Sequence, residues 1–257
     1  MIPSSPARAL AFVLLAGCSR APTAAATGAS AAAASVTAPP ASARGVPPPS
    51  RAAAETVDPL ELEARRQWEV EGKREDIVYV PTPQVVVDRM LDVAKVTQAD
   101  VVYDLGCGDG RIVVTAAKKL GARGVGFDLN PDRVRDARAG VKAAGVESLA
   151  SIRWANVFSV DLEPATVVML YLLPELNVRL LPQLEKLRKG SRVISHDFGM
   201  EGVAPDGHWT MTAPEFVTAD GQSAYRDGVP EDGKHYKERK HDIYLWVAPF
   251  KRGSAKH

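Results

Sequence analysis

The 257 residues, 46% of them hydrophobic and 25% charged, are enough for one full-size domain with its own core, or for two small ones. The two cysteines, Cys18 and Cys107, exclude a disulfide-stapled scaffold and a zinc site built from cysteines. No apolar run reaches the roughly 18 residues that span a bilayer, which excludes a multi-pass membrane protein.

The net charge of +1 is unevenly distributed along the chain. The first 56 residues carry a charge of +3, which leaves −2 for the remainder. Because the binding of phosphate groups relies on a basic surface, this near-neutral remainder argues against nucleic acid as the main partner.

The chain begins with the pattern of a secretory signal: Arg8, an apolar stretch at residues 9–16, and small residues after it. Residues 15–18 (LAGC) resemble a bacterial lipobox, which implies that Cys18 is lipidated and becomes the mature N-terminus. We therefore expect a lipoprotein signal peptide at residues 1–18. The alternative is an alanine-rich tail in which Cys18 has no role.

Residues 19–56 form a segment of low complexity. Of these 38 residues, 32 are Ala, Pro, Ser, Thr or Gly, which offer little side-chain area to offset the cost of ordering the backbone. We expect a disordered linker there, followed by one domain at residues 57–257.

That domain is predicted to open with a helical extension. Apolar residues at helical spacing predict a helix over residues 58–71. Residues 79–83 (YVPTP) break the regular pattern, and a second helix is expected from Thr82 and Pro83 to Ala94.

Strands and helices then alternate, which is typical of a parallel sheet with helices on both faces. The predicted strands are 101–105, 124–128, 151–154, 165–173, 192–196 and 242–248, and the predicted helices are 111–120, 131–144 and 175–189. Residues 199–240 have no clear pattern and are expected to be loop with at most one hairpin.

A glycine-rich turn follows the first predicted strand. Asp104 precedes Gly106, Gly108 and Gly110, and a helix is expected to begin directly afterwards. Such a turn lets the backbone approach a ligand, and the helix N-terminus offers N–H groups to an anion. Asp128, 22 residues after Gly106, ends the next strand, where an acid accepts the hydroxyls of a ribose.

Two nucleotide cofactors fit this arrangement. The dinucleotide fingerprint requires a small residue where Arg111 stands, and Asp104 would repel a pyrophosphate. S-adenosylmethionine (SAM) carries an ammonium and a sulfonium, so a carboxylate at residue 104 favours SAM over a dehydrogenase cofactor. Cys107, inside the turn, is interpreted as a small side chain that fills a tight space.

Residues 104–110 resemble the glycine motif of class I SAM-dependent methyltransferases, and Asp128 matches the ribose-binding acid of that family. Asn156 stands where the family has an Asp or Asn near the adenine. The resemblance covers about residues 77–250. It implies a Rossmann-like α/β fold with a mostly parallel, doubly wound sheet and a terminal antiparallel strand, with SAM as cofactor.

Three further segments narrow the resemblance: residues 79–83, the sequence YLLP at residues 171–174, and SHDF at residues 195–198. They are similar to the protein lysine methyltransferases that modify the mitochondrial adenine-nucleotide carrier and the ATP synthase c-subunit. The similarity implies a methyl acceptor beside the ends of the fourth and fifth strands. The residues expected to bind it are Tyr79, Pro81, Leu172 and Pro174.

Methyl transfer to nitrogen needs alignment and a dry site more than a strong base. Tyr171 is expected close to the methyl group, and His196 and Asp197 are candidates for removing the proton from the amine. The alternatives are a packing role for Tyr171 and an ordinary hydrogen-bonded histidine at residue 196. His235 and His241 are interpreted as part of a solvated hairpin tip, so no metal site is predicted.

Three functions remain open at this point. The first is N-methylation of a protein lysine, the second is methylation of a small molecule, and the third is a lipid-anchored domain that has lost catalysis. The third arises because SAM is made in the cytosol, whereas a lipidated Cys18 would place the domain in the cell envelope. Without that lipidation the protein is expected in the cytoplasm.

Overall fold

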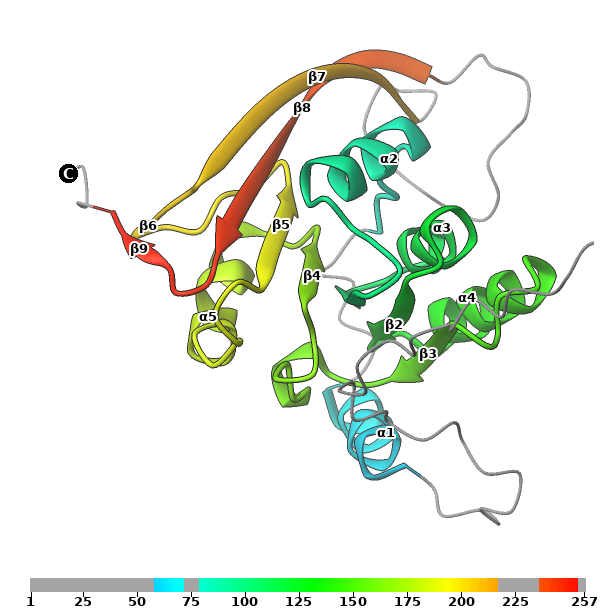
Figure 1. The fold of residues 1–257 in the computed structure, drawn as a ribbon. Coiled ribbons are helices and arrows are strands. Elements are labelled where there is room, and N and C mark those ends of the chain that lie inside the picture. Colours follow the sequence, from blue (N-terminus) through cyan, green and yellow to red (C-terminus); the bar gives the residue numbers. More distant parts are fainter. Residues whose placement is uncertain (1–57, 72–78, 217–235, 254–257) are drawn as a thin grey trace, which may run out of the picture. The chain divides into compact units, whose positions relative to one another are not determined.

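The computed structural model describes residues 58–71, 79–216 and 236–253 (Figure 1). The predicted signal peptide and linker lie outside the described residues. In the described part of the chain, no helix is both long and apolar enough to cross a membrane.

A seven-stranded sheet forms the centre of the domain, in the order β3-β2-β1-β4-β5-β8-β7. Its strands are β1 (Val101–Leu105), β2 (Arg123–Asp128), β3 (Ala150–Trp154), β4 (Val167–Leu170), β5 (Arg192–His196), β7 (Gly207–Phe216) and β8 (Tyr236–Val247). The first five are parallel, and β8 runs antiparallel to both β5 and β7. The predicted Rossmann-like sheet with an antiparallel last strand is confirmed.

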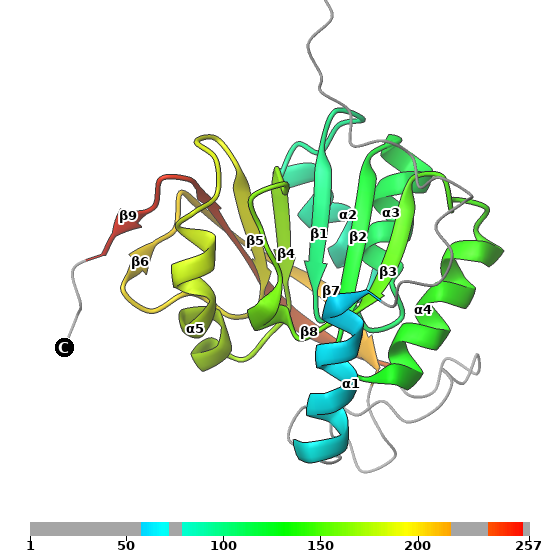
Figure 2. The same ribbon diagram turned by 90° about the horizontal axis from the view of Figure 1, so that it is seen from below.

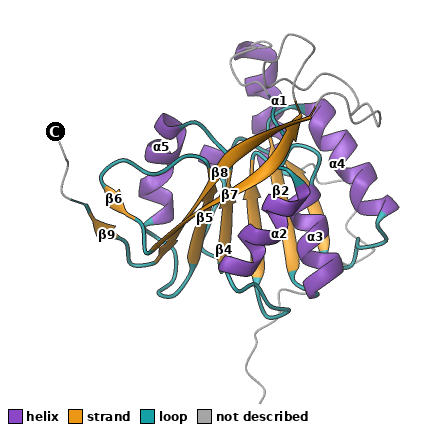
Figure 3. Cartoon of the chain, turned by 90° about the horizontal axis from the view of Figure 1, so that it is seen from above, coloured by secondary structure: helices purple, strands orange, loops and turns teal. Residues whose placement is uncertain are grey.

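Helices cover both faces of this sheet. They are α1 (Pro59–Glu71), α2 (Gln84–Val93), α3 (Arg111–Leu120), α4 (Pro131–Ala143) and α5 (Pro174–Leu184), with the short 3-10 helix η1 (Val157–Ser159) after β3. Figure 2 shows α1 and α5 in front of the sheet and α2 and α3 behind it. The opposite view in Figure 3 brings α2 and α3 to the front.

The burial of β4 explains why its sequence is almost entirely apolar. All four residues are fully buried. Side chains alternate between the faces of a strand: Val168 and Leu170 pack in the cluster that contains α5, and Val167 and Met169 pack in the cluster with α2 and α3. A strand enclosed in this way places its carboxyl end, and that of β1 beside it, at one edge of the sheet. Ligands bind at such an edge where the strand order reverses.

The region after β5 differs from the sequence-based prediction. Residues 199–240 were expected to be mostly loop, but β7 and β8 form a long hairpin, and β6 (Val203–Ala204) pairs with β9 (Lys251–Arg252). The pattern was hidden because charged residues stand on the buried face of the hairpin, where apolar ones are expected. Glu215 and His241 are both buried.

Two predicted elements are longer than the observed ones. The strand expected at 165–173 covers Val167–Leu170, and the helix expected at 175–189 ends at Leu184. Pro182 lies in the last turn of that helix. Because proline lacks a backbone donor and crowds the preceding turn, Pro182 weakens the end of this helix.

Candidate active site

Three glycines in the left-handed backbone region shape the loop between β1 and α3. The φ angle is +80° at Gly106, +54° at Gly108 and +78° at Gly110, which side chains rarely adopt. The N–H groups of Gly106 and Cys107 both donate to the carbonyl of Phe127 on β2, at 2.8 and 2.9 Å. The loop is thereby fixed to the neighbouring strand and leads directly into the N-terminus of α3.

Asp104 is a buried carboxyl with an open acceptor atom. Its residue is 3% exposed, and its Oδ2 atom has no hydrogen-bond partner among the described residues. Burial, followed by the nearby charges of Asp109 and Asp128, raises the pKa of Asp104 to about 8. An orphaned acceptor of this kind is costly in a fold, and an ammonium group placed beside it would satisfy it.

Asp128 connects β2 to the glycine loop. Its Oδ2 accepts the N–H of Gly108 and its Oδ1 accepts the N–H of Asn130, both at 2.9 Å. Burial raises the pKa of Asp128, and these backbone donors counteract part of that effect. A carboxylate has about four acceptor positions, so two remain for the hydroxyls of a ribose.

The interpretation of Cys107 as a space-filling residue agrees with the structure. The side chain is buried, and a Cβ on Gly126 of the neighbouring strand would lie 2.8 Å from its sulfur. Burial raises the pKa of the thiol, so it stays protonated and unreactive.

Tyr79 covers the glycine loop. A Cβ on Gly108 would lie only 2.0 Å from the Tyr79 ring, so glycine is required there. The Tyr79 hydroxyl accepts the N–H of Asp109 at 3.2 Å, and the Arg133 guanidinium lies 4.2 Å from the ring centre. Pro81 is half-buried two residues further on. The segment predicted to contact the acceptor therefore lies directly against the predicted cofactor loop.

Asn156 follows β3 at the same edge of the sheet and contacts α1. Its side-chain oxygen accepts the N–H of Phe158 at 2.9 Å, which caps η1, and its amide donates to Gln67 at 2.7 Å. An ion pair between Arg153 and Asp58 also holds α1 there, at 2.5 Å. No pattern in the sequence indicates that Gln67 reaches this edge, so it was not predicted.

The end of β4 lies beside the glycine loop. Leu172 is buried, and a Cβ on Gly106 would lie 3.0 Å from its side chain. Pro174 is exposed and begins α5. The ring of Tyr171 packs on His196 with centroids 4.0 Å apart, and its hydroxyl donates to Asp197 at 3.2 Å.

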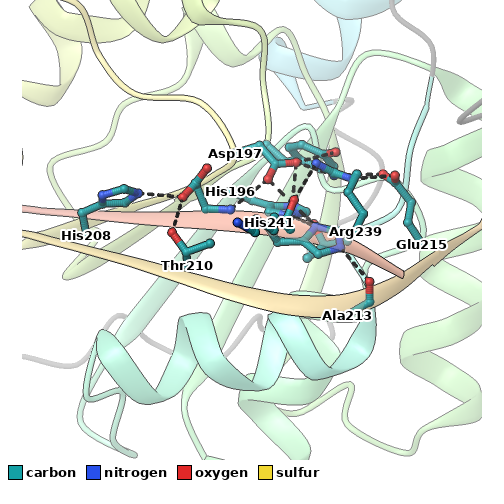
Figure 4. A network of polar contacts seen from close by, with 12 residues as sticks. His196, Asp197, His208, Thr210, Ala213, Glu215, Arg239 and His241 are labelled. Atoms are coloured by element: carbon teal, nitrogen blue, oxygen red, sulfur yellow. Dashed lines mark hydrogen bonds and ion pairs between the residues drawn. The ribbon is translucent and has the colours of Figure 1, made fainter. Parts of the chain in front are cut away.

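Asp197 joins a group of buried charges that Figure 4 shows. Its Oδ2 accepts from Arg239 at 2.6 Å, and the same guanidinium nitrogen donates to Glu215 at 2.9 Å. A second ion pair, between Arg239 Nε and Glu215, measures 2.6 Å. Arg239 and Glu215 stand on the β7–β8 hairpin. The sequence allowed one hairpin in this region but did not indicate its strands, so neither residue was predicted.

A chain of hydrogen bonds links two buried histidines. His241 Nε2 lies 3.3 Å from the carbonyl of Ala213, His196 Nε2 lies 2.9 Å from His241 Nδ1, and Thr82 Oγ1 lies 3.1 Å from His196 Nδ1. A carbonyl only accepts, so His241 carries its proton on Nε2 and accepts on Nδ1. His196 then donates from Nε2, and the Thr82 hydroxyl donates to His196 Nδ1.

Two predictions about histidines are corrected by this chain. His241 is fully buried and does not belong to a solvated hairpin tip; His235 lies outside the described residues. His196 is also fully buried, and burial lowers its pKa to about 3. With both ring nitrogens occupied, His196 does not take a proton directly from an acceptor, and it is better described as a hydrogen-bonded residue of the interior.

The ligand atoms of His196, Asp197 and His241 lie within 4.8 Å of one another, close enough to share a metal ion. The sequence predicted no metal site. All four ring nitrogens have hydrogen-bond partners, and the Arg239 cation already neutralises Asp197. These contacts account for the cluster as a hydrogen-bonded network.

The chain is similar to known methyltransferases. The ANTKMT methyltransferase domain family matches residues 104–207. A protein-lysine N-methyltransferase from Saccharolobus islandicus is 51% identical over 131 residues, which are 50% of this chain and 81% of that protein. The human lysine N-methyltransferase of the ATP synthase c-subunit is 31% identical over 144 residues, and the match spans 57% of its length.

The chain belongs to the family of SAM-dependent protein-lysine N-methyltransferases. A solved structure supports the cofactor: an RNA methyltransferase from Salinibacter ruber in complex with S-adenosylhomocysteine (SAH) is 42% identical, with a TM-score of 0.54. The match covers 69% of this chain and all of that one. The fold, the enzyme class and the SAM cofactor predicted from the sequence are thereby confirmed.

The residues present fit SAM. The unpartnered oxygen of Asp104 suits the ammonium of its amino-acid part, and the glycine loop leaves room for the backbone to approach its carboxylate. SAM supplies a methyl group already activated by the sulfonium. The protein has to hold the cofactor, exclude water and align the acceptor.

Proposed function

We propose that this enzyme N-methylates a lysine side chain of a protein acceptor. The observation that carries the proposal is the position of the Tyr171 hydroxyl, beside a buried carboxylate at the sheet edge and next to Leu172, which touches the glycine loop. An amine entering there meets a hydrogen-bond acceptor close to the cofactor. The relative from Saccharolobus islandicus supports a lysine as the source of that amine.

In this proposal each predicted cofactor residue binds a different part of SAM. Asp104 binds the ammonium, the backbone around Gly106, Cys107, Gly108 and Gly110 receives the carboxylate end, Asp128 binds the ribose and Asn156 lies near the adenine. Tyr79, Pro81, Leu172 and Pro174 form the walls of the acceptor site. Asp104 and Asp128 lie at the carboxyl ends of β1 and β2. Leu172 and Pro174 follow β4, and Tyr79 lies against the glycine loop.

A lysine must lose its proton before it attacks the methyl group. From a reference pKa near 10.4, deprotonation at pH 7 costs about 4–5 kcal/mol. Desolvation beside the apolar walls of the site lowers the pKa of the lysine. His196 is not available to remove the proton, so we propose that the proton leaves to solvent before the amine is enclosed.

An RNA acceptor is the second candidate, because the Salinibacter ruber relative is described as an RNA methyltransferase. The charge of −2 on the 201 residues after the linker argues against it, since RNA binding relies on basic surfaces. A small-molecule acceptor remains a third outcome of the same experiment.

The experiment uses the full chain, SAM carrying a radioactive methyl group, and a cell extract. The proposal expects label that precipitates with protein and is released by protease but not by ribonuclease. Label released by ribonuclease would establish RNA as the acceptor, and label that passes a small-molecule filter would establish a metabolite. Either result would overturn the proposal.

Replacing Asp128 with alanine is expected to weaken SAM binding by at least about a hundredfold. Two ribose hydrogen bonds to a charged acceptor are lost, each contributing roughly 1.5–3 kcal/mol, and the bond to Gly108 is lost as well. Calorimetric titration with SAM measures the change. Asp128→Asn, which keeps one acceptor oxygen, should fall between the two proteins, and unchanged affinity in the alanine variant would exclude the ribose assignment.

We also propose that residues 1–18 are a lipoprotein signal and that lipidated Cys18 anchors the enzyme to a membrane in the cell envelope. The lipobox resemblance of residues 15–18 and the low-complexity composition of residues 19–56 support this arrangement. Cys18→Ser should move the protein from the membrane fraction to the soluble fraction of the cell. If the unaltered protein is already soluble, the anchor is wrong and the cytoplasm, where SAM is made, is its location.

A further inference from the structure

Asp197 is held in one place by the strand beside it. Its N–H donates to the carbonyl of Asp242 at 2.7 Å, and its Oδ1 accepts the N–H of Asp242 at 3.1 Å. Its φ angle of +61° is unusual for a residue with a side chain. The carboxylate is thus fixed by β8, and its second oxygen, Oδ2, points to the Tyr171 hydroxyl.

The hairpin supplies the charges around that second oxygen. Arg239 stands directly across from Ala213 in the β7–β8 register, and Glu215 lies two residues further along β7. Diagonal neighbours of this kind are within reach of long side chains. The Arg239 guanidinium bridges two nearly buried carboxylates, Asp197 with a side chain 10% exposed and Glu215 with one 6% exposed.

The Arg239 bridge determines which group is the donor in the hydrogen bond between Tyr171 and Asp197. An ionised carboxylate only accepts, so the Tyr171 hydroxyl must donate to Asp197. The lone pairs of the tyrosine oxygen then face away from Asp197 and can accept an N–H of an incoming amine. Without a cation beside it, a buried carboxyl becomes protonated and can itself donate, which removes this fixed direction.

We propose that Arg239 and Glu215 are positioning residues for methyl transfer: by holding Asp197 ionised and in place, they orient the Tyr171 hydroxyl toward the acceptor amine. This role rests on the proposed function in placing Tyr171 at the point of methyl transfer. Glu215 acts by aligning Arg239: one guanidinium nitrogen donates a hydrogen bond to Glu215, and the Nε atom lies 2.6 Å from the other oxygen of the same carboxylate as a charge contact without hydrogen-bond geometry.

The test measures ligand binding and needs no known acceptor. SAH has no group at the transferred methyl, whereas sinefungin, a SAM analogue, carries an amine there. We expect the unaltered enzyme to bind sinefungin at least about tenfold more tightly than SAH, because its amine meets the oriented Tyr171 hydroxyl. In Arg239→Gln this preference should disappear while the affinity for SAH stays within about twofold of the original value. Arg239→Lys, which keeps the cation but loses the bridge, should retain part of it, and remains informative if Arg239→Gln does not fold.

Two controls separate positioning from a merely structural role. Lys237→Met removes a positive charge from an exposed site on the same strand and should leave the preference unchanged. In a Tyr171→Phe background, Arg239→Gln should change the preference no further, because both act through one hydroxyl.

A parallel loss of affinity for both ligands, or additive losses in the double variant, would overturn the proposal. So would stoichiometric metal bound to His196, Asp197 and His241 in the purified enzyme. Failure to find a methylated lysine would refute the proposed acceptor. It would not affect the comparison of sinefungin with SAH, because the binding of these two ligands requires no acceptor.

Discussion

Replacing Asp104 with asparagine is expected to weaken SAM binding by about a hundredfold at pH 7, close to 2.7 kcal/mol. The variant keeps the shape of the side chain but removes the charge that pairs with the ammonium of the cofactor. Charge-assisted hydrogen bonds in buried sites are worth roughly 1.5–3 kcal/mol. Calorimetric titration with SAM measures the loss, and SAH, which has the same ammonium, should lose affinity equally.

The same substitution is expected to stabilise the protein in the absence of cofactor. Between pH 4 and 8 the carboxyl of Asp104 is ionised in the unfolded chain but protonated in the folded one, where its pKa is about 8. The folded state therefore binds more protons, and stability falls as pH rises through this window, by an amount on the order of 5 kcal/mol. Asp104→Asn should abolish this part of the pH dependence.

Denaturation of both proteins without cofactor at pH 4 and pH 8 measures that difference. The two should be close in stability at pH 4, and the variant should be more stable at pH 8. SAM binding to the unaltered enzyme at pH 6–7 should release about one proton, which titrations in buffers of different ionisation enthalpy detect. An unchanged affinity together with no proton release would show that Asp104 does not contact the cofactor.

Tyr171→Phe is expected to lower kcat by about a hundredfold with little change in SAM affinity. The ring and its packing on His196 remain, but the hydroxyl that receives the amine is lost. Small misalignments of reacting groups cost on this order. Rates at saturating SAM, together with calorimetric SAM affinities, separate the two effects.

Tyr103→Phe is the matched control, because it removes a tyrosine hydroxyl from a buried residue of β1 that is not among the residues proposed to bind the cofactor or the acceptor. That variant should keep the rate of the unaltered enzyme. If Tyr171→Phe is equally active, Tyr171 is a packing residue and the acceptor must be aligned by other groups.

The cofactor side of the site was predictable because local chemistry determines it. The three glycines of the loop are required by positive φ angles, and Asp104 and Asp128 end up close together because β1 and β2 are adjacent and parallel. Glycines in a turn and acids at strand ends can be recognised in the sequence alone. The same holds for the β4–α5 turn, where Pro174 begins the helix.

The acceptor side was less predictable because the strands that carry it lack an alternating pattern. Arg239 and Glu215 stand on strands whose buried face carries charges, so the alternation of apolar and polar residues that reveals a strand is absent. His241 was misread for the same reason: among charged neighbours a histidine resembles a surface residue, whereas here it is hydrogen-bonded to His196 in the interior.

The identity of the methylated atom distinguishes a protein-lysine methyltransferase from an enzyme with another acceptor. Protein labelled by the enzyme with methyl-radioactive SAM is hydrolysed in acid, and its amino acids are separated. We expect the label to elute as Nε-methylated lysine and to fall about a hundredfold when Tyr171→Phe replaces the unaltered enzyme at equal concentration and time. Label in any other amino acid, or in nucleotides of co-purified RNA, would contradict it.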